Sequence, residues 1–110
     1  MKTVLVLGHA GMGHGDTEVG QRILRTFLQK CRAIRELQTI VLFNSGVKLA
    51  AVGSPVLSEL QHLYEAGIDI LPCGTCLEFF DLTDKLAVGE ISNMDAIVNE
   101  LSSADKVITL

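Results

Sequence analysis

Residues 67–80, GIDILPCGTCLEFF, join an apolar run directly to two cysteines and a second apolar segment. The run Ile68–Leu71 predicts a short strand, and the segment Leu77–Phe80 predicts the first turn of a helix. Cys73 and Cys76 therefore lie at a strand-to-helix turn, where unpaired backbone N–H groups and the helix dipole stabilise negative charge. Such a position lowers the pKa of a thiol and favours the reactive thiolate, so we expect the chemistry of this protein here.

Strand and helix patterns alternate along the whole chain. Short continuous apolar runs are typical of strands buried on both faces, and apolar residues at helical spacing predict helices that cover them. The predicted strands are Val4–Leu7, Thr39–Phe43, Ile68–Leu71, Ala87–Ile91 and Lys106–Leu110. The predicted helices are Thr17–Ile34, Pro55–Ala66, Cys76–Leu82 and Met94–Leu101, with Asp16, Ser54 and Asn93 or Ser92 as N-caps. This order predicts an α/β fold with a mostly parallel five-stranded sheet, covered by helices on both faces, in a single domain of residues 1–110.

The composition limits the classes of function open to the chain. Its 110 residues are 48% hydrophobic and carry a formal net charge of −4, and the mean hydropathy is +0.38. The acidic surplus argues against binding to nucleic acid or an anionic membrane, and no apolar run approaches the ~20 residues of a membrane span. Three cysteines, an odd number, favour a thiol function in a reducing compartment, so we expect a cytoplasmic protein. The high hydropathy favours a homo-oligomer over a lone monomer.

Three loops are expected to meet at one edge of the sheet. In a parallel sheet, ligands gather beyond the carboxyl ends of the strands, which brings together the loops 8–16, 44–48 and 72–76. Gly11 and Gly13 in the first of these loops are candidate ligand-binding residues. Their signal is weak, because the loop lacks both of the glycine motifs that bind nucleotides.

The Cys-x-x-Cys spacing allows several kinds of chemistry. A thioredoxin fold is excluded, because its motif follows an early strand and faces a later proline, whereas Cys73 and Cys76 follow the third predicted strand. A small dithiol oxidoreductase without that fold stays open. So does a metal-binding or assembly module, since His9 and His14 are expected at the same sheet edge and could complete a tetrahedral zinc site with the two thiols. Cys31 lies on the apolar face of the first predicted helix and is expected in the core.

Five segments together resemble a known family. They are Gly13–Gly20, Phe43–Leu49, Cys73–Leu77, Val88–Met94 and Ala104–Ile108. These segments are similar to the DsrE-like domain of YedF-type proteins of selenium metabolism, within the DsrE/DsrF-like family. The resemblance implies a three-layer α/β/α domain, a trimer or hexamer, and a sulfur-relay role with sulfur-donor and acceptor proteins as partners. For this role we expect no cofactor and no metal. In those YedF-type relatives, a TusA-like domain precedes the DsrE-like domain, whereas this sequence begins with the DsrE-like part. The sequence therefore leaves open whether the transferred element is sulfur or selenium.

The resemblance also separates the two thiols by role. Cys73 occupies the strand-end position at which the family accepts sulfur as a persulfide, so the carrier role falls to it. Cys76 is the additional thiol, and we expect it to release the cargo by forming a disulfide with Cys73 or to protect Cys73. The backbone N–H groups of Gly74 and Thr75 are expected to stabilise the thiolate. Asn44 is a candidate donor of an amide hydrogen bond to a sulfur anion, and a role in capping its strand explains it equally well.

Overall fold

Four parallel strands form the sheet at the centre of the structure, a computed structural model that describes residues 1–110. The strands are β1 (Thr3–Leu7), β2 (Leu37–Leu42), β3 (Asp69–Pro72) and β4 (Lys106–Thr109), in the spatial order β3-β2-β1-β4. All three neighbouring pairs are parallel. The predicted parallel sheet is therefore confirmed, and it has four strands rather than the expected five.

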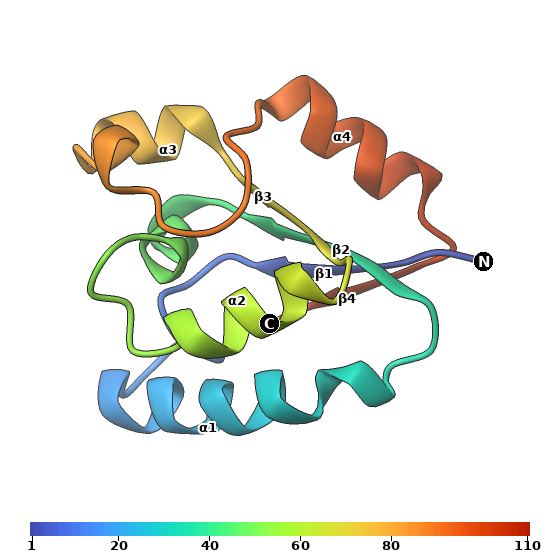
Figure 1. Ribbon diagram of the computed structural model, residues 1–110, viewed down its shortest axis with the longest axis horizontal. Helices are drawn as coiled ribbons and strands as arrows, with labels where there is room; N and C mark the ends of the chain where they lie inside the picture. Colours follow the sequence, from blue (N-terminus) through green and yellow to red (C-terminus); the bar gives the residue numbers. More distant parts are fainter.

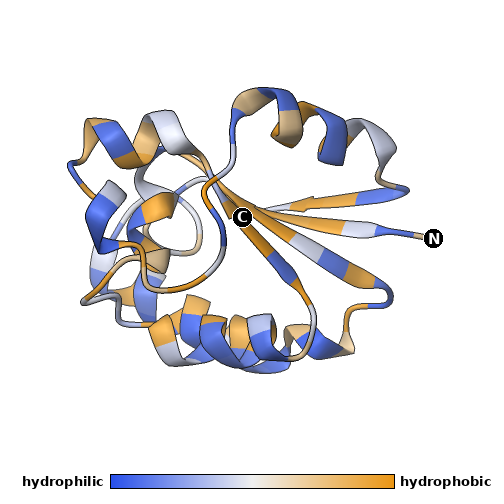
Figure 2. Ribbon diagram, turned by 45° about the horizontal axis from the view of Figure 1, so that its top comes forward, coloured by the Kyte–Doolittle hydropathy of each residue, from blue (hydrophilic) through white to orange (hydrophobic).

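Helices cover both faces of this sheet. They are α1 (Thr17–Lys30), α2 (Leu57–Glu65), α3 (Gly74–Phe79) and α4 (Met94–Ser103), joined by the short 3-10 segments η1 (Cys31–Ala33), η2 (Asn44–Ala50) and η3 (Thr83–Lys85). Figure 1 shows α1 and α2 on one side of the sheet and α3 and α4 on the other, and the turned view in Figure 2 agrees. This is the expected α/β/α arrangement. None of the helices has both the length and the apolar character that crossing a membrane requires.

The sheet is the centre of the hydrophobic core. All five residues of β1 and the last four residues of β2 are buried. Figure 2 shows the strands mostly in hydrophobic colours, whereas the helices alternate between hydrophobic and hydrophilic residues. Leu24 and Leu28 of α1, Leu60 of α2 and Ile97 of α4 pack into the same core. Complete burial of one such side chain stabilises the fold by about 1.5–3 kcal/mol, so these contacts fix the positions of the strands.

Two of the three predicted N-caps are confirmed. The side chains of Asp16 and Asn93 each accept a hydrogen bond from a backbone N–H in the first turn, at 2.9 and 2.8 Å, which confirms both as N-caps. The second helix, in contrast, begins at Leu57 and not at Pro55. Ser54 Oγ accepts a hydrogen bond at 3.2 Å from the N–H two residues later, so this serine caps a turn that precedes the helix.

The predicted strand Ala87–Ile91 is instead a loop beside the outer edge of β3. The loop bends at Gly89, whose φ of +86° is left-handed. A Cβ on Gly89 would lie 2.5 Å from the carbonyl oxygen of Ile70, the same oxygen that accepts a hydrogen bond from the Glu90 N–H at 3.0 Å. The bend interrupts the extended conformation that a strand needs. The apolar pattern therefore indicates a segment that approaches β3 but does not become a fifth strand.

The connections that follow β2 and β3 leave the sheet on opposite faces. After β2 the chain passes through η2 to α2, which packs beside α1, whereas after β3 it enters α3 on the other side (Figure 1). Diverging connections between adjacent parallel strands leave a crevice at their carboxyl ends, where open α/β sheets bind ligands. The strand register places Leu42 beside Pro72, so the residues that follow these two come together in that crevice.

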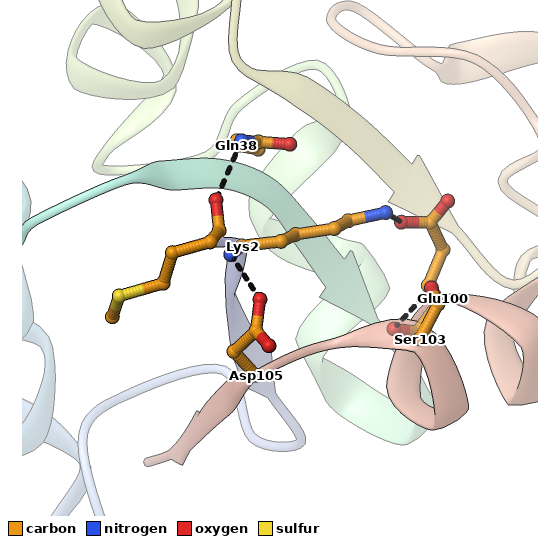
Figure 3. Close-up of polar contacts among 6 residues, drawn as sticks. Lys2, Gln38, Glu100, Ser103 and Asp105 are labelled. Carbon is orange, nitrogen blue, oxygen red and sulfur yellow. Dashed lines mark hydrogen bonds and ion pairs between the residues drawn. The ribbon is translucent and has the colours of Figure 1, made fainter.

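At the opposite end of the sheet, polar contacts tie the N-terminus to the last helix and strand (Figure 3). The Lys2 backbone N–H donates to the Asp105 carboxylate at 2.6 Å, and Lys2 Nζ forms an ion pair with Glu100 of α4 at 2.5 Å. Gln38 Nε2 donates to the Met1 carbonyl oxygen at 3.2 Å. These contacts hold the start of β1 between β2 and β4, away from the cysteines.

Gly46→Ala is expected to destabilise the fold strongly. A Cβ at Gly46 would lie 2.1 Å from the Leu7 carbonyl oxygen, and this oxygen belongs to a central, fully buried strand. Overpacking of this kind costs about 1–3 kcal/mol or more, a large part of the roughly 5–15 kcal/mol that holds a domain folded. Urea denaturation should show a much lower midpoint or no folded state. Gly20→Ala is the control, because its Cβ meets nothing closer than 3.4 Å; equal destabilisation of both variants contradicts this account.

Candidate functional site

Cys73 directly follows the last residue of β3 and is the N-cap of α3. Its backbone N–H donates to the Leu42 carbonyl oxygen at 2.9 Å, which extends the pairing of β2 with β3 by one residue. Only 2% of Cys73 is exposed. The sheet and the helix therefore hold this thiol inside the molecule, where solvent does not reach it.

Cys76 lies in the first turn of α3, as predicted, although this helix begins at Gly74 and not at Cys76. The residue is partly exposed and lines an open cavity of about 560 Å³, named here the thiol cavity. The other residues of the thiol cavity are Phe43, Asn44, Thr75, Phe79, Phe80 and Met94. Cys73 is not among them, so a molecule that enters the cavity meets Cys76 first.

Two groups interact with the sulfur of Cys76. The backbone N–H of Asn44 donates a hydrogen bond to Sγ at 3.1 Å, and the neighbouring Cys73 thiol influences the ionisation of Cys76. The sequence predicts a donor in the side-chain amide of Asn44, whereas the structure places the donor in its main chain. No disulfide joins the cysteines, so both are free thiols.

Burial raises the pKa of the Cys76 thiol above its ordinary value, contrary to the lowering expected at a helix start. The Asn44 N–H lowers this pKa, while the neighbouring Cys73 thiol raises it further. The dipole of α3 is small because the helix has only six residues, and the aromatic walls of the cavity do not replace the water lost on burial. At neutral pH, Cys76 is therefore mostly a protonated thiol with one N–H directed at its sulfur.

The two residues between the cysteines differ in what their N–H groups can do. The Gly74 N–H donates to the Ser92 carbonyl oxygen at 2.8 Å, so it is not available to a thiolate and the expectation for Gly74 is wrong. A Cβ on Gly74 would lie 3.0 Å from the same oxygen, which explains a glycine at this position. The Thr75 N–H makes no hydrogen bond, and Thr75 lines the thiol cavity, so it stays a candidate donor.

Gly11 and Gly13 belong to a second, separate cavity. Their loop lines a space of about 270 Å³ over the start of α1, and none of its residues lines the thiol cavity. Gly11 packs closely on α1, since a Cβ there would lie 3.1 Å from the Gly20 carbonyl carbon. Gly13 has a left-handed φ of +78°. The structure therefore does not bring either glycine to the thiols.

The loop histidines also lie apart from the thiols. The ring centroids of His9 and His14 are 6.2 Å apart, and both residues line the same cavity of about 270 Å³ as Gly11 and Gly13. No three side chains of the His, Cys, Asp or Glu type gather closely enough to hold a metal ion. The alternative in which these histidines complete a zinc site with Cys73 and Cys76 of the same chain is therefore wrong.

The aromatic walls of the thiol cavity are not predicted from the sequence. Phe79 is 82% exposed and meets Phe80 edge to face, with ring centroids 5.2 Å apart. Lys48 of η2 lies over the Phe80 ring with Nζ 4.4 Å from its centroid, a cation–π contact. Two phenylalanines within one turn of Cys76 are the signal in the sequence. From the sequence alone, two phenylalanines in a helix predict a buried apolar face, and they do not indicate that these side chains surround a cavity.

Comparison with known proteins gives one family and several similar folds. The family model described as "DsrE/DsrF-like family" matches residues 1–110. Among solved structures, the YchN protein from E. coli has a TM-score of 0.75 and 21% identity over 100% of both chains. MTH1491 from Methanobacterium thermoautotrophicum has a TM-score of 0.74 and 17% identity, over 99% of this chain and 98% of its own. BT1422 from Bacteroides thetaiotaomicron has a TM-score of 0.69 and 17% identity, over 99% of this chain and 95% of its own.

These structural likenesses concern the fold alone. At 17–21% identity they support the α/β architecture of the whole chain, and any role must be argued from the residues of the site. A search of curated proteins found no match.

Alkylation of the folded protein should label Cys76 before the two buried cysteines, and its rate should keep rising with pH. Because the pKa of Cys76 is raised, most of this thiol is protonated at neutral pH, and the rate should still be rising at a pH where the rate of an unperturbed thiol levels off. Cys31, 2% exposed, is the internal control for buried thiols. Peptide mass spectrometry after timed iodoacetamide treatment measures each site. A plateau in the Cys76 rate below pH 8 shows a lowered pKa and contradicts this account.

Proposed function

Because the chain belongs to the DsrE/DsrF-like family, we propose that it is a sulfur-relay protein that takes a sulfane sulfur from a donor persulfide and passes it to an acceptor protein. One observation carries the proposal. Two free thiols lie three residues apart where β3 passes into α3, beside the carboxyl end of β2, and only the outer one, Cys76, lines an open cavity. A persulfide group of a partner fits this arrangement, because its terminal sulfur must come into contact with one protein thiol.

The first step in this proposal takes place at Cys76. Its thiolate attacks the outer sulfur of the donor persulfide, a new S–S bond forms at Cys76 Sγ, and the S–S bond of the donor breaks. The donor leaves as a thiolate and takes up the proton that Cys76 gave to solvent, so no external oxidant or reductant takes part. The Asn44 N–H stabilises the anion during attack, since hydrogen bonds to charged acceptors are stronger than those to neutral ones.

The second step moves the sulfur to Cys73, which keeps the carrier role implied by the family resemblance. The Cys73 thiolate attacks the outer sulfur of the Cys76 persulfide, Cys73 becomes the persulfide, and its proton returns to Cys76. Because Cys73 is 2% exposed, its persulfide is protected from soluble thiols that would otherwise remove the sulfur. Cys76 is thus the entry point, and Cys73 is the storage site.

Release to an acceptor reverses these steps at Cys76. Alternatively, the Cys76 thiolate attacks Cys73 Sγ, which frees hydrosulfide and leaves a Cys73–Cys76 disulfide that cytoplasmic thiols reduce. Donor and acceptor proteins are the proposed partners, in the cytoplasm, and the exposed apolar residues of the chain support a homo-oligomer. A selenium atom would follow the same route, since the chemistry of attack on a terminal chalcogen is shared.

A dithiol oxidoreductase is the second candidate function. Two free thiols in a Cys-x-x-Cys motif support it, because this spacing is typical of thiols that form a reversible disulfide. The two functions differ in what the protein retains. A relay protein isolated after treatment with a persulfide donor carries extra sulfur on a cysteine, whereas an oxidoreductase carries only the disulfide.

Cys76→Ser is expected to slow sulfur loading from a small persulfide donor by about tenfold or more, because Cys73 reacts only in the fraction of molecules that open locally. Cys73→Ser should load at Cys76 at nearly the normal rate but lose its sulfur faster when a soluble thiol is added. Tandem mass spectrometry of the peptide containing both cysteines locates the sulfur in each variant.

Cys31→Ala is the control for this experiment, since that thiol lies in the core behind α1 and its loss should leave loading unchanged. If Cys76→Ser loads as fast as the unmodified protein, the donor reaches Cys73 directly and the entry role of Cys76 is wrong. If the unmodified protein forms a disulfide and never retains sulfur, the relay function itself is wrong and the oxidoreductase takes its place.

A further inference from the structure

Asn44 has an unusual backbone conformation at the thiol site. Its φ is +52°, one of three left-handed values at non-glycine residues, together with Glu36 and Asp81. L-residues other than glycine adopt this region rarely, and asparagine is among the few that tolerate it. Unusual backbone conformations cluster at functional sites, so a left-handed residue in contact with a reactive thiol points to a functional role more strongly than one in an ordinary surface turn.

The backbone on both sides of the Asn44 N–H explains how this group stays on Cys76. Phe43 is extended, with φ −146° and ψ 171°, and the chain reverses at Asn44 to begin η2. At this reversal the N–H of Asn44 donates to Cys76 Sγ at 3.1 Å. The Asn44 N–H lies in the peptide plane that follows the extended Phe43, so the end of the strand directs it toward the start of α3. The left-handed φ of Asn44 lets the chain reverse immediately after this N–H, so that η2 can begin without drawing the N–H away from the sulfur.

Neighbouring contacts hold this turn in place. The Gly46 N–H closes the turn onto the Phe43 carbonyl oxygen at 3.0 Å, and Gly46 packs directly on the Leu7 carbonyl group. The Ser45 hydroxyl accepts a hydrogen bond from the Ala10 N–H at 3.2 Å. The N–H of Asn44 is thus fixed before any substrate binds, which is the condition under which a hydrogen bond to a developing charge helps a reaction.

The surroundings of Cys76 give this single N–H a large influence on how well negative charge on Sγ is stabilised. The residues that line the thiol cavity carry no charged side chain, and the titratable neighbour of Cys76 is the Cys73 thiol, which disfavours a second negative charge. Charged residues on the adjacent elements are Lys48 of η2, Glu78 of α3, and Asp95 and Glu100 of α4, and none of them lines the cavity.

We propose that Asn44 is a positioning residue whose left-handed backbone holds its N–H on Cys76 Sγ and thereby sets how readily this thiol ionises and attacks. The proposal rests on the sulfur-relay function for its biological meaning, and on the observed hydrogen bond for its chemistry. It assigns the effect to the main chain of residue 44. The side-chain amide serves only to make the left-handed conformation acceptable.

Substitutions that differ in their tolerance of positive φ test this inference. Asn44→Val should disfavour the left-handed conformation, because β-branched residues are genuine outliers there, whereas Asn44→Gly keeps the conformation and removes the amide. The readout is the rate of alkylation of Cys76 by iodoacetamide from pH 6.5 to 10, followed by peptide mass spectrometry. Asn44→Val should shift the pH profile upward, with a rate at pH 7.5 about tenfold lower, and Asn44→Gly should restore the original profile.

Glu36→Val is the matched control, because it places valine at a similar φ of +57° in a loop outside the thiol cavity. It should lower stability to a similar extent without moving the Cys76 profile. Asn44→Ala, which strains the turn less than valine, provides an intermediate if the valine variant does not fold. If the pH profile of Cys76 alkylation shifts upward equally in Asn44→Gly and Asn44→Val, the side-chain amide is responsible and the proposal is wrong. If the profile is unchanged in a folded Asn44→Val or Asn44→Ala, residue 44 has no influence on Cys76 and the proposal is also wrong. Alkylation needs no sulfur donor, so this outcome is separate from the loading experiment that tests the relay function.

Discussion

The register between β2 and β3 is the constraint on which the whole site depends. Leu42 lies beside Pro72, and the hydrogen bond from the Cys73 N–H to the Leu42 carbonyl oxygen closes the pairing at 2.9 Å. Asn44 and Cys76 meet because each lies a short, fixed distance beyond this last pair. Side chains alternate along a strand, so a slip of one residue would exchange the faces of β3 and remove Cys73 from the core. Burial of the neighbouring strand residues on both faces of the sheet prevents that slip.

The same packing gives two chemically identical thiols different environments. Cys73 is enclosed by the sheet and the helix start, whereas Cys76 borders a cavity with aromatic walls. A raised pKa leaves less thiolate at neutral pH, but the thiolate that forms is the stronger nucleophile, because intrinsic reactivity falls as the pKa of a thiol falls. Below its pKa the lower thiolate fraction outweighs this gain, so the rate at which Cys76 attacks depends on any group that stabilises its thiolate, such as the Asn44 N–H.

The order of elements follows from the sequence because it depends on local patterns. Apolar runs locate the four strands, and two cysteines between an apolar run and a helix start place the thiols at the edge of the sheet. The remaining features depend on contacts between distant segments. Ala87–Ile91 has the composition of a strand, but the close approach of Gly89 to Ile70 bends it. The pKa of Cys76 rises because of burial, and the Gly74 N–H is occupied by a carbonyl group from the loop before α4. No local pattern in the sequence encodes these contacts.

The order in which sulfur reaches the two cysteines tests the central claim most directly. The unmodified protein would receive one equivalent of a small persulfide donor, the reaction would be quenched at intervals from milliseconds to minutes, and tandem mass spectrometry would locate the sulfur. The account predicts that sulfur appears on Cys76 first, declines there, and accumulates on Cys73 at the same rate. Sulfur that appears on Cys73 without an earlier phase on Cys76, or on neither thiol, would contradict it.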